Sequence, residues 1–209
     1  MKLRSLVYKG CGIVCVKITN FFCNLWLKFS LWCLDVKFVS ITTTGLPFIK
    51  VSRNGQMVIG KNLRIHNGIK GNPIGFYQRC TFVVDAGATI RIGDNVGISQ
   101  SSLVAASDII IGNNVKIGGG CCVWTTDFHS IDPEIRSSTD DMKFRKSRPV
   151  EICDNAFIGA GSIILKGVRI GYNSIVGAGA VVTKSIPDNE IWGGNPACFI
   201  RCLESKHKA

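Results

Sequence analysis

The segment TTDFHSIDPEIR, residues 125–136, places one of the three histidines of the chain among groups that could move a proton. An imidazole with an ordinary pKa of about 6.5 is largely neutral at pH 7 and can accept the proton of a hydroxyl group. Asp127, two residues before His129, offers a carboxylate that could hold the ring in one tautomer. Such a pair suits acyl transfer to a hydroxyl, with a backbone N–H stabilising the tetrahedral oxyanion. His129 is therefore a candidate general base and Asp127 its candidate partner.

The elements that must position these residues follow a repeat of six. Ile or Val occupies every sixth position over three stretches, with one slip of a single residue between the first two. These positions, here called anchors, are Ile92, Ile98, Val104, Ile111, Ile117, Val123, Ile152, Ile158, Ile164, Ile170, Val176 and Val182. A period of six matches neither the 3.6 residues of a helical turn nor simple strand alternation. It predicts short strands joined by tight turns, three to a coil, whose anchors point into a triangular prism.

The repeat is lost between Val123 and Ile152, and the histidine lies in this interruption. The excursion is rich in charges of both signs and contains no long apolar run. A long excursion of this kind is more often a functional loop than an accident. We therefore expect a loop over residues 124–150 to carry a site, with the stacked coils as its support.

The stretches IGNNVKIG and IGAGSIILKGVRIGYNSIVGAGAVVTK resemble the bacterial hexapeptide-repeat acyltransferases, and the resemblance covers residues 45–201. It implies an all-β fold, a left-handed parallel β-helix, assembled as a homotrimer. In that family a loop of this kind carries the catalytic histidine into the cleft between neighbouring subunits, and His129 matches that position. The motifs DFHSIDPEIR and IWGGNPA are most similar to O-acetyltransferases of bacterial capsule or lipopolysaccharide sugars.

The resemblance also implies acetyl-CoA as co-substrate, bound along the C-terminal coils. The residues that match the family's contacts, from the pantetheine arm to the phosphates, are Phe157, Ala160, Ala178, Thr183, Lys184 and Arg201. The basic residues suit a phosphorylated ligand because of their charge. After GNPA the family usually has Lys or Arg, whereas this chain has Cys198, so the phosphate contacts would depend more on Lys184 and Arg201. For each small residue taken alone, coil geometry is an equally good explanation.

Acceptor-binding residues are expected on the coils before the loop and in the loop itself. By the resemblance, Gln100 stands where the family places an amide that contacts the acceptor, and Arg136 fits the motif that follows the histidine. Asp85 is a further candidate from a neighbouring coil. Trp124 could form an apolar wall for a sugar face or pack between subunits.

The other histidines and the cysteines suggest no further chemistry. His66 and His207 have no histidine close to them in the sequence, so we expect no metal site. The 10 cysteines form no Cys-x-x-Cys pair. Because the sequence contains no cleavable secretory signal, these cysteines are expected to be reduced in the cytosol. Cys122 is a conceivable nucleophile, but nothing near it in the sequence would activate a thiolate.

The first part of the chain, residues 1–40, is predicted to be an apolar and basic helical segment. Its residues 1–35 contain no charge-free run long enough to span a bilayer and no signal-peptide cleavage site. The segment could lie peripherally on the inner face of a membrane, or it could pack on the trimer and cover the open end of the β-helix. Residues 41–196 are predicted to form the β-helix, and residues 197–209 a short C-terminal helix and tail.

Together these features predict a cytoplasmic, acetyl-CoA-dependent O-acetyltransferase that acts on a sugar hydroxyl in bacterial surface polysaccharide biosynthesis. The acetyl group would pass directly to a sugar or sugar-linked acceptor in a ternary complex, with His129 as general base. An N-acetyltransferase of an amino sugar nucleotide, a serine or small-sugar acetyltransferase, and a non-catalytic binding module remain alternatives. A nucleic-acid partner is not expected, because no recognition module accompanies the net charge of +11.

Overall fold

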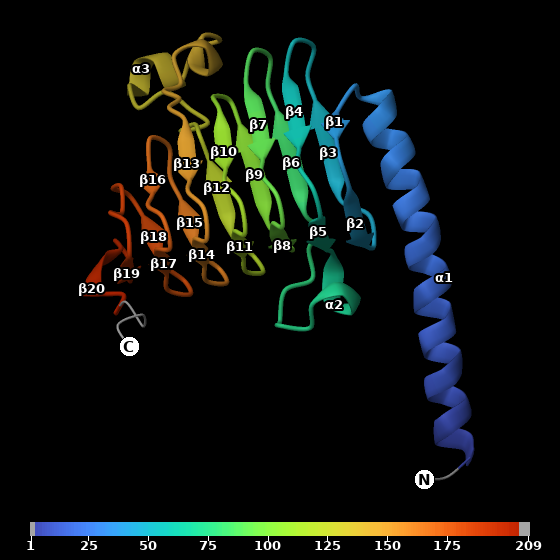
Figure 1. The fold of residues 1–209 in the computed structure, drawn as a ribbon. Coiled ribbons are helices and arrows are strands. Elements are labelled where there is room, and N and C mark those ends of the chain that lie inside the picture. The colour runs from blue at the N-terminus through green and yellow to red at the C-terminus, as the bar shows by residue number, and fades with distance from the viewer. Residues whose placement is uncertain (1–2, 205–209) are drawn as a thin grey trace.

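Stacked coils of β-strand form a three-sided prism in a computed structural model that describes residues 3–204, with side chains from residue 12 onward (Figure 1). The three sides are sheets of six, eight and six strands, here called sheets A, B and C. Their strands pair in parallel, except for the last two strands of sheet B. Successive strands along the chain pass from sheet A to sheet B to sheet C, and each coil stacks on the one before it. The predicted all-β fold, a left-handed parallel β-helix, is confirmed.

Each sheet collects one strand from each of the first six coils, and sheet B also contains the last two strands of the chain. Sheet A contains β1 (Lys37–Phe38), β4 (Gln56–Ile59), β7 (Thr89–Ile92), β10 (Ile109–Ile111), β13 (Val150–Ile152) and β16 (Arg169–Ile170). Sheet B contains β2 (Ile41–Thr44), β5 (Leu63–His66), β8 (Gly97–Ser99), β11 (Lys116–Ile117), β14 (Phe157–Ile158), β17 (Ile175–Val176), β19 (Glu190–Gly193) and β20 (Cys198–Cys202). Sheet C contains β3 (Phe48–Val51), β6 (Thr81–Val84), β9 (Ser102–Ala105), β12 (Cys122–Trp124), β15 (Ile163–Ile164) and β18 (Val181–Val182).

The anchors fill the interior of the prism, with one exception. Eleven of the twelve are buried, whereas Val104 is half-exposed. In β9 the buried residues are Leu103 and Ala105, and Leu103 lies in register with Val123 and Phe82 of the neighbouring coils. The prediction for Val104 is therefore wrong by one residue, because the step from Ile98 to the next buried aliphatic residue, Leu103, is five residues and not six.

From the second coil onward, one corner of each coil is turned by an asparagine in the left-handed backbone region. Six asparagines at the corner between sheets A and B have φ between +58° and +62°: Asn62, Asn95, Asn114, Asn155, Asn173 and Asn189. Their side-chain amides form a continuous ladder, in which each Nδ2 donates to the Oδ1 of the next asparagine at 2.7–3.3 Å. Asparagine tolerates this backbone conformation better than most residues do, so the ladder closes the corner and links consecutive coils.

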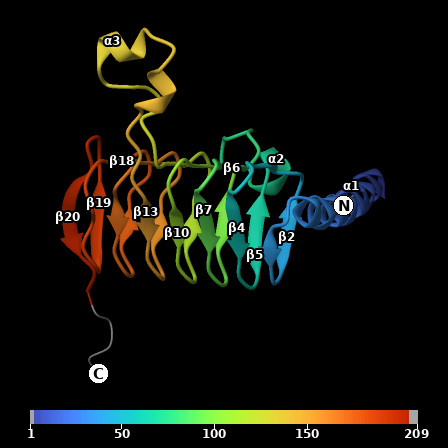
Figure 2. The same cartoon turned by 90° about the horizontal axis from the view of Figure 1, so that it is seen from above.

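Two excursions leave the coils at different edges of the prism. The first, between β5 and β6, contains the short helix α2 (Gly68–Gly71) and follows sheet B. The second, between β12 and β13, contains α3 (Pro133–Arg136) and the 3-10 helix η1 (Asp141–Lys143) and joins sheet C to sheet A. Figure 2 shows the second excursion, hereafter the histidine loop, standing away from the body of coils. The loop predicted over residues 124–150 is thus present, with its ends entering β12 and β13.

The long helix α1 (Leu3–Cys33) lies against the first coil. Leu27 and Leu31 are buried there, and the side chain of Asn24 exchanges two hydrogen bonds of 2.8 Å with the backbone of Thr43 in β2. The C-terminal half of α1 therefore covers the open end of the β-helix, whereas its packing on a trimer stays a prediction. Much of the helix nevertheless extends beyond the prism (Figure 1).

The C-terminal segment differs from the prediction. Residues 198–202 form strand β20, which pairs antiparallel with β19, and not the expected short helix. An antiparallel partner occupies hydrogen-bonding groups at the edge of sheet B that would otherwise remain open. His207 lies outside the residues that the structure describes.

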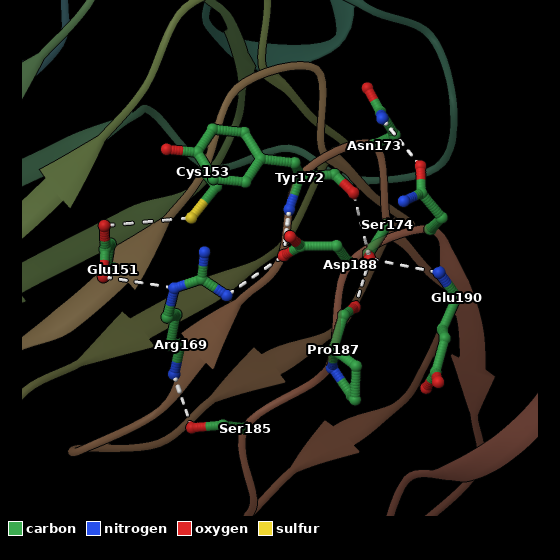
Figure 3. A network of polar contacts seen from close by, with 11 residues as sticks. Glu151, Cys153, Arg169, Tyr172, Asn173, Ser174, Ser185, Pro187, Asp188 and Glu190 are labelled. Atoms are coloured by element: carbon green, nitrogen blue, oxygen red, sulfur yellow. Dashed lines mark hydrogen bonds and ion pairs between the residues drawn. The ribbon is translucent and has the colours of Figure 1, made fainter.

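Polar contacts fasten the last coil to the one before it (Figure 3). The Arg169 guanidinium lies 3.1 Å from Asp188 Oδ1 and 3.5 Å from Glu151 Oε2. The fully buried Ser174 hydroxyl donates to the Pro187 carbonyl at 2.6 Å and accepts from the Glu190 N–H. The Ser174 hydroxyl thus pairs with two backbone groups at the point where the regular ladder of strands comes to an end.

Replacing Asn114 tests what the corner asparagine contributes. Asn114→Ala should lower the free energy of unfolding by about 1–2 kcal/mol, because alanine in the left-handed region is strained and the ladder is broken. Asn114→Gly breaks the same ladder but adopts this φ freely, so its loss should be smaller. Chemical denaturation of both variants measures the difference, and equal losses would show that backbone conformation is not what asparagine supplies here.

Candidate functional site

A histidine–carboxylate pair lies at the centre of the histidine loop. His129 Nδ1 is 2.6 Å from Asp141 Oδ2, and the Ser130 N–H donates to the other carboxylate oxygen at 2.7 Å. The hydrogen bond from His129, and after it that from the Ser130 N–H, lowers the pKa of Asp141. Because an ionised carboxylate can only accept, it places the proton of a neutral His129 on Nδ1 and leaves a lone pair on Nε2. The His129 side chain is 63% exposed, and in the described part of the chain Nε2 has no hydrogen-bond partner.

The carboxylate partner of His129 is therefore Asp141, and the prediction of Asp127 is wrong. Asp127 pairs with Lys166 of the next coil, and its backbone N–H donates to Lys146 across the base of the loop. Between Asp127 and His129 the chain turns through Phe128, whose φ is +66°. Asp127 thus helps to attach the loop to the coils, while the residue that orients His129 comes from η1.

Several contacts hold the loop in one shape. Asp132 caps α3 through its side chain, accepting from the backbone N–H groups of Glu134 and Ile135, with Pro133 at the first turn. The Arg136 guanidinium donates to the carbonyls of Ser130 and, more distantly, Ile131, at 3.1 and 3.3 Å. Arg136 thus braces the turn that carries His129, and its predicted contact with the acceptor stays a prediction.

The remaining acceptor candidates have different surroundings. Asp85, after β6, forms an ion pair of 2.6 Å with Arg145 of the histidine loop. Trp124 packs edge-to-face on Phe128, with ring centroids 5.5 Å apart, at the point where the loop leaves β12. Both residues therefore tie the loop to the coils, and any contact of theirs with an acceptor is still untested.

Gln100 is fully buried, which contradicts its predicted place on an acceptor-binding surface. Its Nε2 lies 2.7–2.9 Å from three carbonyl oxygens of the first excursion, those of Gly68, Asn72 and Phe76. No local pattern indicates this role, because the excursion that folds over Gln100 comes from the preceding coil. The side chain holds that excursion in place.

The predicted cofactor residues divide into three positions. Phe157, 46% exposed, lies on β14, and Ala160 and Ala178 lie one above the other where consecutive coils leave sheet B. Backbone approaches closely at this edge, since a Cβ added to Gly159 would lie 2.5 Å from the Ala178 nitrogen. Exposed Thr183 and Lys184 follow β18 of sheet C, and exposed Arg201 lies in β20 of sheet B. Within residues 3–204, no hydrogen bond or ion pair joins the three positions to one another.

A groove over sheet B was missed by the sequence analysis. It has a volume of about 380 Å³, and Arg64, His66, Lys116 and Phe157 lie among its walls. Burial, and after it the charge of Arg64, lowers the pKa of His66. Only the register between coils brings these residues together, so no local motif could have revealed the groove. The histidine loop leaves the prism at another edge, between sheets C and A.

Two alternative chemistries find no support in the geometry. Burial raises the pKa of the Cys122 thiol, which disfavours the thiolate that a nucleophile would need. Among the residues that the structure describes, no group of three or more His, Cys, Asp or Glu side chains could hold a metal ion.

Comparison with known proteins identifies the repeat. The family model described as the hexapeptide repeat of succinyl-transferase matches residues 149–184. The chain is 37% identical over 126 residues to the putative acetyltransferase YJL218W of Saccharomyces cerevisiae, covering 60% of this chain and 62% of the relative. It is 40% identical over 127 residues to the galactoside O-acetyltransferase of Lactococcus lactis, covering 60% and 58%. The chain thus spans less than two thirds of the length of these curated relatives.

A solved structure agrees with these matches. The hexapeptide-repeat-containing acetyltransferase VCA0836 of Vibrio cholerae is 33% identical, with a TM-score of 0.51 over 56% of this chain and 64% of its own. The sixfold repeat, the three-sheeted coil and these matches show that the chain contains a hexapeptide repeat and that it is similar, over about 60% of its length, to acetyltransferases built from this repeat.

Proposed function

We propose that the protein transfers the acetyl group of acetyl-CoA to a hydroxyl group of a sugar or sugar-linked acceptor. The observation that carries this proposal is the His129–Asp141 pair, which leaves His129 Nε2 exposed and basic on a loop of a hexapeptide-repeat coil. The galactoside O-acetyltransferase similarity supports a sugar hydroxyl as the acceptor, and the Vibrio cholerae protein has been solved with acetyl coenzyme A. Surface polysaccharide biosynthesis in bacteria is the setting that the sequence motifs favour.

The geometry suits direct transfer in a ternary complex. Acetyl-CoA supplies a thioester carbonyl as the acyl donor. Asp141 keeps the His129 ring oriented, and Nε2 accepts the acceptor's hydroxyl proton as the new C–O bond forms. When the C–S bond breaks, the protonated ring returns this proton to the departing sulfur, so His129 is neutral again at the end of the cycle. No covalent bond to the enzyme is needed.

The C-terminal coils offer a surface that fits the co-substrate. The small side chains of Ala160 and Ala178 leave neighbouring backbone groups accessible beside the exposed ring of Phe157. Exposed Lys184 and Arg201 could pair with phosphates through charge-assisted hydrogen bonds, with Thr183 beside them. Cys198, where the family usually has a basic residue, is exposed and contributes no charge.

The arrangement of the site favours a homotrimer. The histidine loop and the groove over sheet B lie at different edges of one prism, so one chain does not bring them together. A threefold ring in which the loop of one subunit reaches the sheet B groove of the next would complete three equivalent sites.

The exposed side of α1 supports a membrane contact of residues 1–35. Phe21, Phe22, Leu25, Trp26 and Phe29 are more than half exposed, and Lys17 and Lys28 of the same helix can pair with anionic lipids. Within residues 3–204, the part Gly12–Cys33 is also long and apolar enough to cross a membrane, although lysines interrupt it. We place the protein in the cytoplasm, with α1 at the inner face of the membrane.

Removing the proposed base should abolish most of the activity. We expect His129→Ala to lower kcat by about 10²–10⁴-fold, the usual contribution of general base catalysis, while CoA still binds. Release of the CoA thiol with a panel of sugars and nucleotide sugars measures the rate, and calorimetry measures CoA binding. Thr139→Ala, an exposed change in the same loop, is the control. Equal turnover by wild type and His129→Ala would contradict the assignment.

The two loop aspartates allow a matched test of which carboxylate orients the base. Asp141→Asn should reduce kcat by about tenfold or more, because the amide can bond the ring in the wrong tautomer. Asp127→Asn should cost much less in kcat, since Asp127 pairs with Lys166 and not with His129. The reverse order of effects, measured by thiol release on variants with equal thermal stability, would restore Asp127 as the partner.

A further inference from the structure

A row of outward-facing residues runs along sheet B across four coils. Arg64 of β5 lies in register with Gly97 of β8, Gly97 with Lys116 of β11, and Lys116 with Phe157 of β14. Adjacent strands lie about 4.8 Å apart, so the two cationic residues flank a position that has no side chain. The row forms the floor of the 380 Å³ groove.

The glycine in this row shapes the groove. A Cβ added to Gly97 would lie 3.4 Å from Lys116 Cδ and 3.8 Å from Lys116 Nζ. The lysine side chain therefore lies over the glycine, toward Arg64, and its Nζ donates to the Asn95 carbonyl at 3.0 Å. Glycine thus lets the two cations approach one another along the floor.

Their positive charge has no ionic counterpart among the side chains of residues 12–204. None of the ion pairs among the described residues includes Arg64 or Lys116, and no Asp or Glu lines the groove. Burial, and after it the charge of Arg64, lowers the pKa of Lys116. With a net charge of +11, unpaired basic residues are common in this chain, but these two face one another inside a concave site. Two such cations favour a bound anion.

The other walls are suited to the rest of a sugar. Ser99, Asn72 and the neutral form of His66 provide uncharged polar groups, and Phe157 provides an exposed ring at the far end of the row. The Phe157 end is also where the pantetheine arm of the co-substrate is proposed to lie. A ligand that fills the groove would therefore extend from the cations toward the acyl donor.

We propose that this groove binds the acceptor through an anionic group, a phosphate or a carboxylate, held between Arg64 and Lys116. The proposal rests on the proposed acetyl transfer and names the class of acceptor, an acidic or phosphorylated sugar. The neutral polar walls hold the sugar ring, and its reacting hydroxyl faces the end of the groove near Phe157. His129 of a neighbouring subunit would approach from outside.

Binding measured without turnover tests the anion site separately from catalysis. We expect galactose 1-phosphate or galacturonate to bind the full-length protein, in titration calorimetry, more tightly than galactose does. Arg64→Gln combined with Lys116→Gln should weaken binding of the charged sugar by about ten- to a hundredfold, since charge-assisted hydrogen bonds are lost. The two charged probes distinguish a phosphate site from a carboxylate site.

A control at a basic residue outside the groove, compared with each single groove variant, separates the groove from general electrostatics. Arg91→Gln removes one basic group from the outer face of β7 in sheet A, and it should leave binding of the charged sugar unchanged. If the groove variant binds charged and neutral sugars as the wild type does, or loses affinity for CoA instead, the proposal is overturned. If His129→Ala loses turnover but still binds the charged sugar, the result supports both the acetyl transfer and the anion site. If the wild type binds the charged sugar but shows no turnover, only the acetyl transfer is refuted.

Discussion

The fold depends on turning the chain at the same corner of successive coils, and from the second coil onward an asparagine in the left-handed backbone region makes this turn. Where no excursion intervenes, consecutive asparagines of the ladder are separated by 16 to 19 residues, and the separations of 33 and 41 mark the two excursions. A constant corner keeps the anchors over one another inside, and it also aligns outward residues of different coils. Rows such as Arg64, Gly97, Lys116 and Phe157 are therefore a consequence of core closure.

The coils have little freedom to build a catalytic centre, because nearly every inward position is taken by an aliphatic side chain. The histidine loop escapes this restriction by leaving the coil, and it must then supply its own order. Ion pairs of Asp85 with Arg145 and of Asp127 with Lys166 fasten its base to the prism. Its own hydrogen bonds then hold Asp141 against His129. Asp85 and Asp127, which are candidate site residues in the sequence, thus attach the loop to the coils.

The sequence predicted best what repetition or strong local chemistry determines. The period of six located eleven buried anchors and the loop that carries His129, while the partial failure at Val104 arose where one side of a coil is shorter. Asp141 could not be found, because its distance from His129 depends on the path of the loop. The burial of Gln100 could not be predicted, because the excursion that covers it is remote in sequence. The strand β20 was also missed, because it pairs with the open edge of β19, which only the folded coil presents.

The division of the candidate site between two edges has a chemical advantage. A base on a projecting loop remains solvated. It can deprotonate the acceptor only when a second surface binds the acceptor beside it and excludes water. If that surface belongs to a neighbouring chain, the exposed Nε2 of His129 is reached only in the assembled protein, where the groove over sheet B fixes the acceptor. In such an assembly the row of strand residues, whose positions are set by the register of the coils, would select the acceptor. His129, on a separate loop whose residues lie outside the groove, would remove the proton. Substitutions in the row and in the loop should accordingly change acceptor affinity and rate independently.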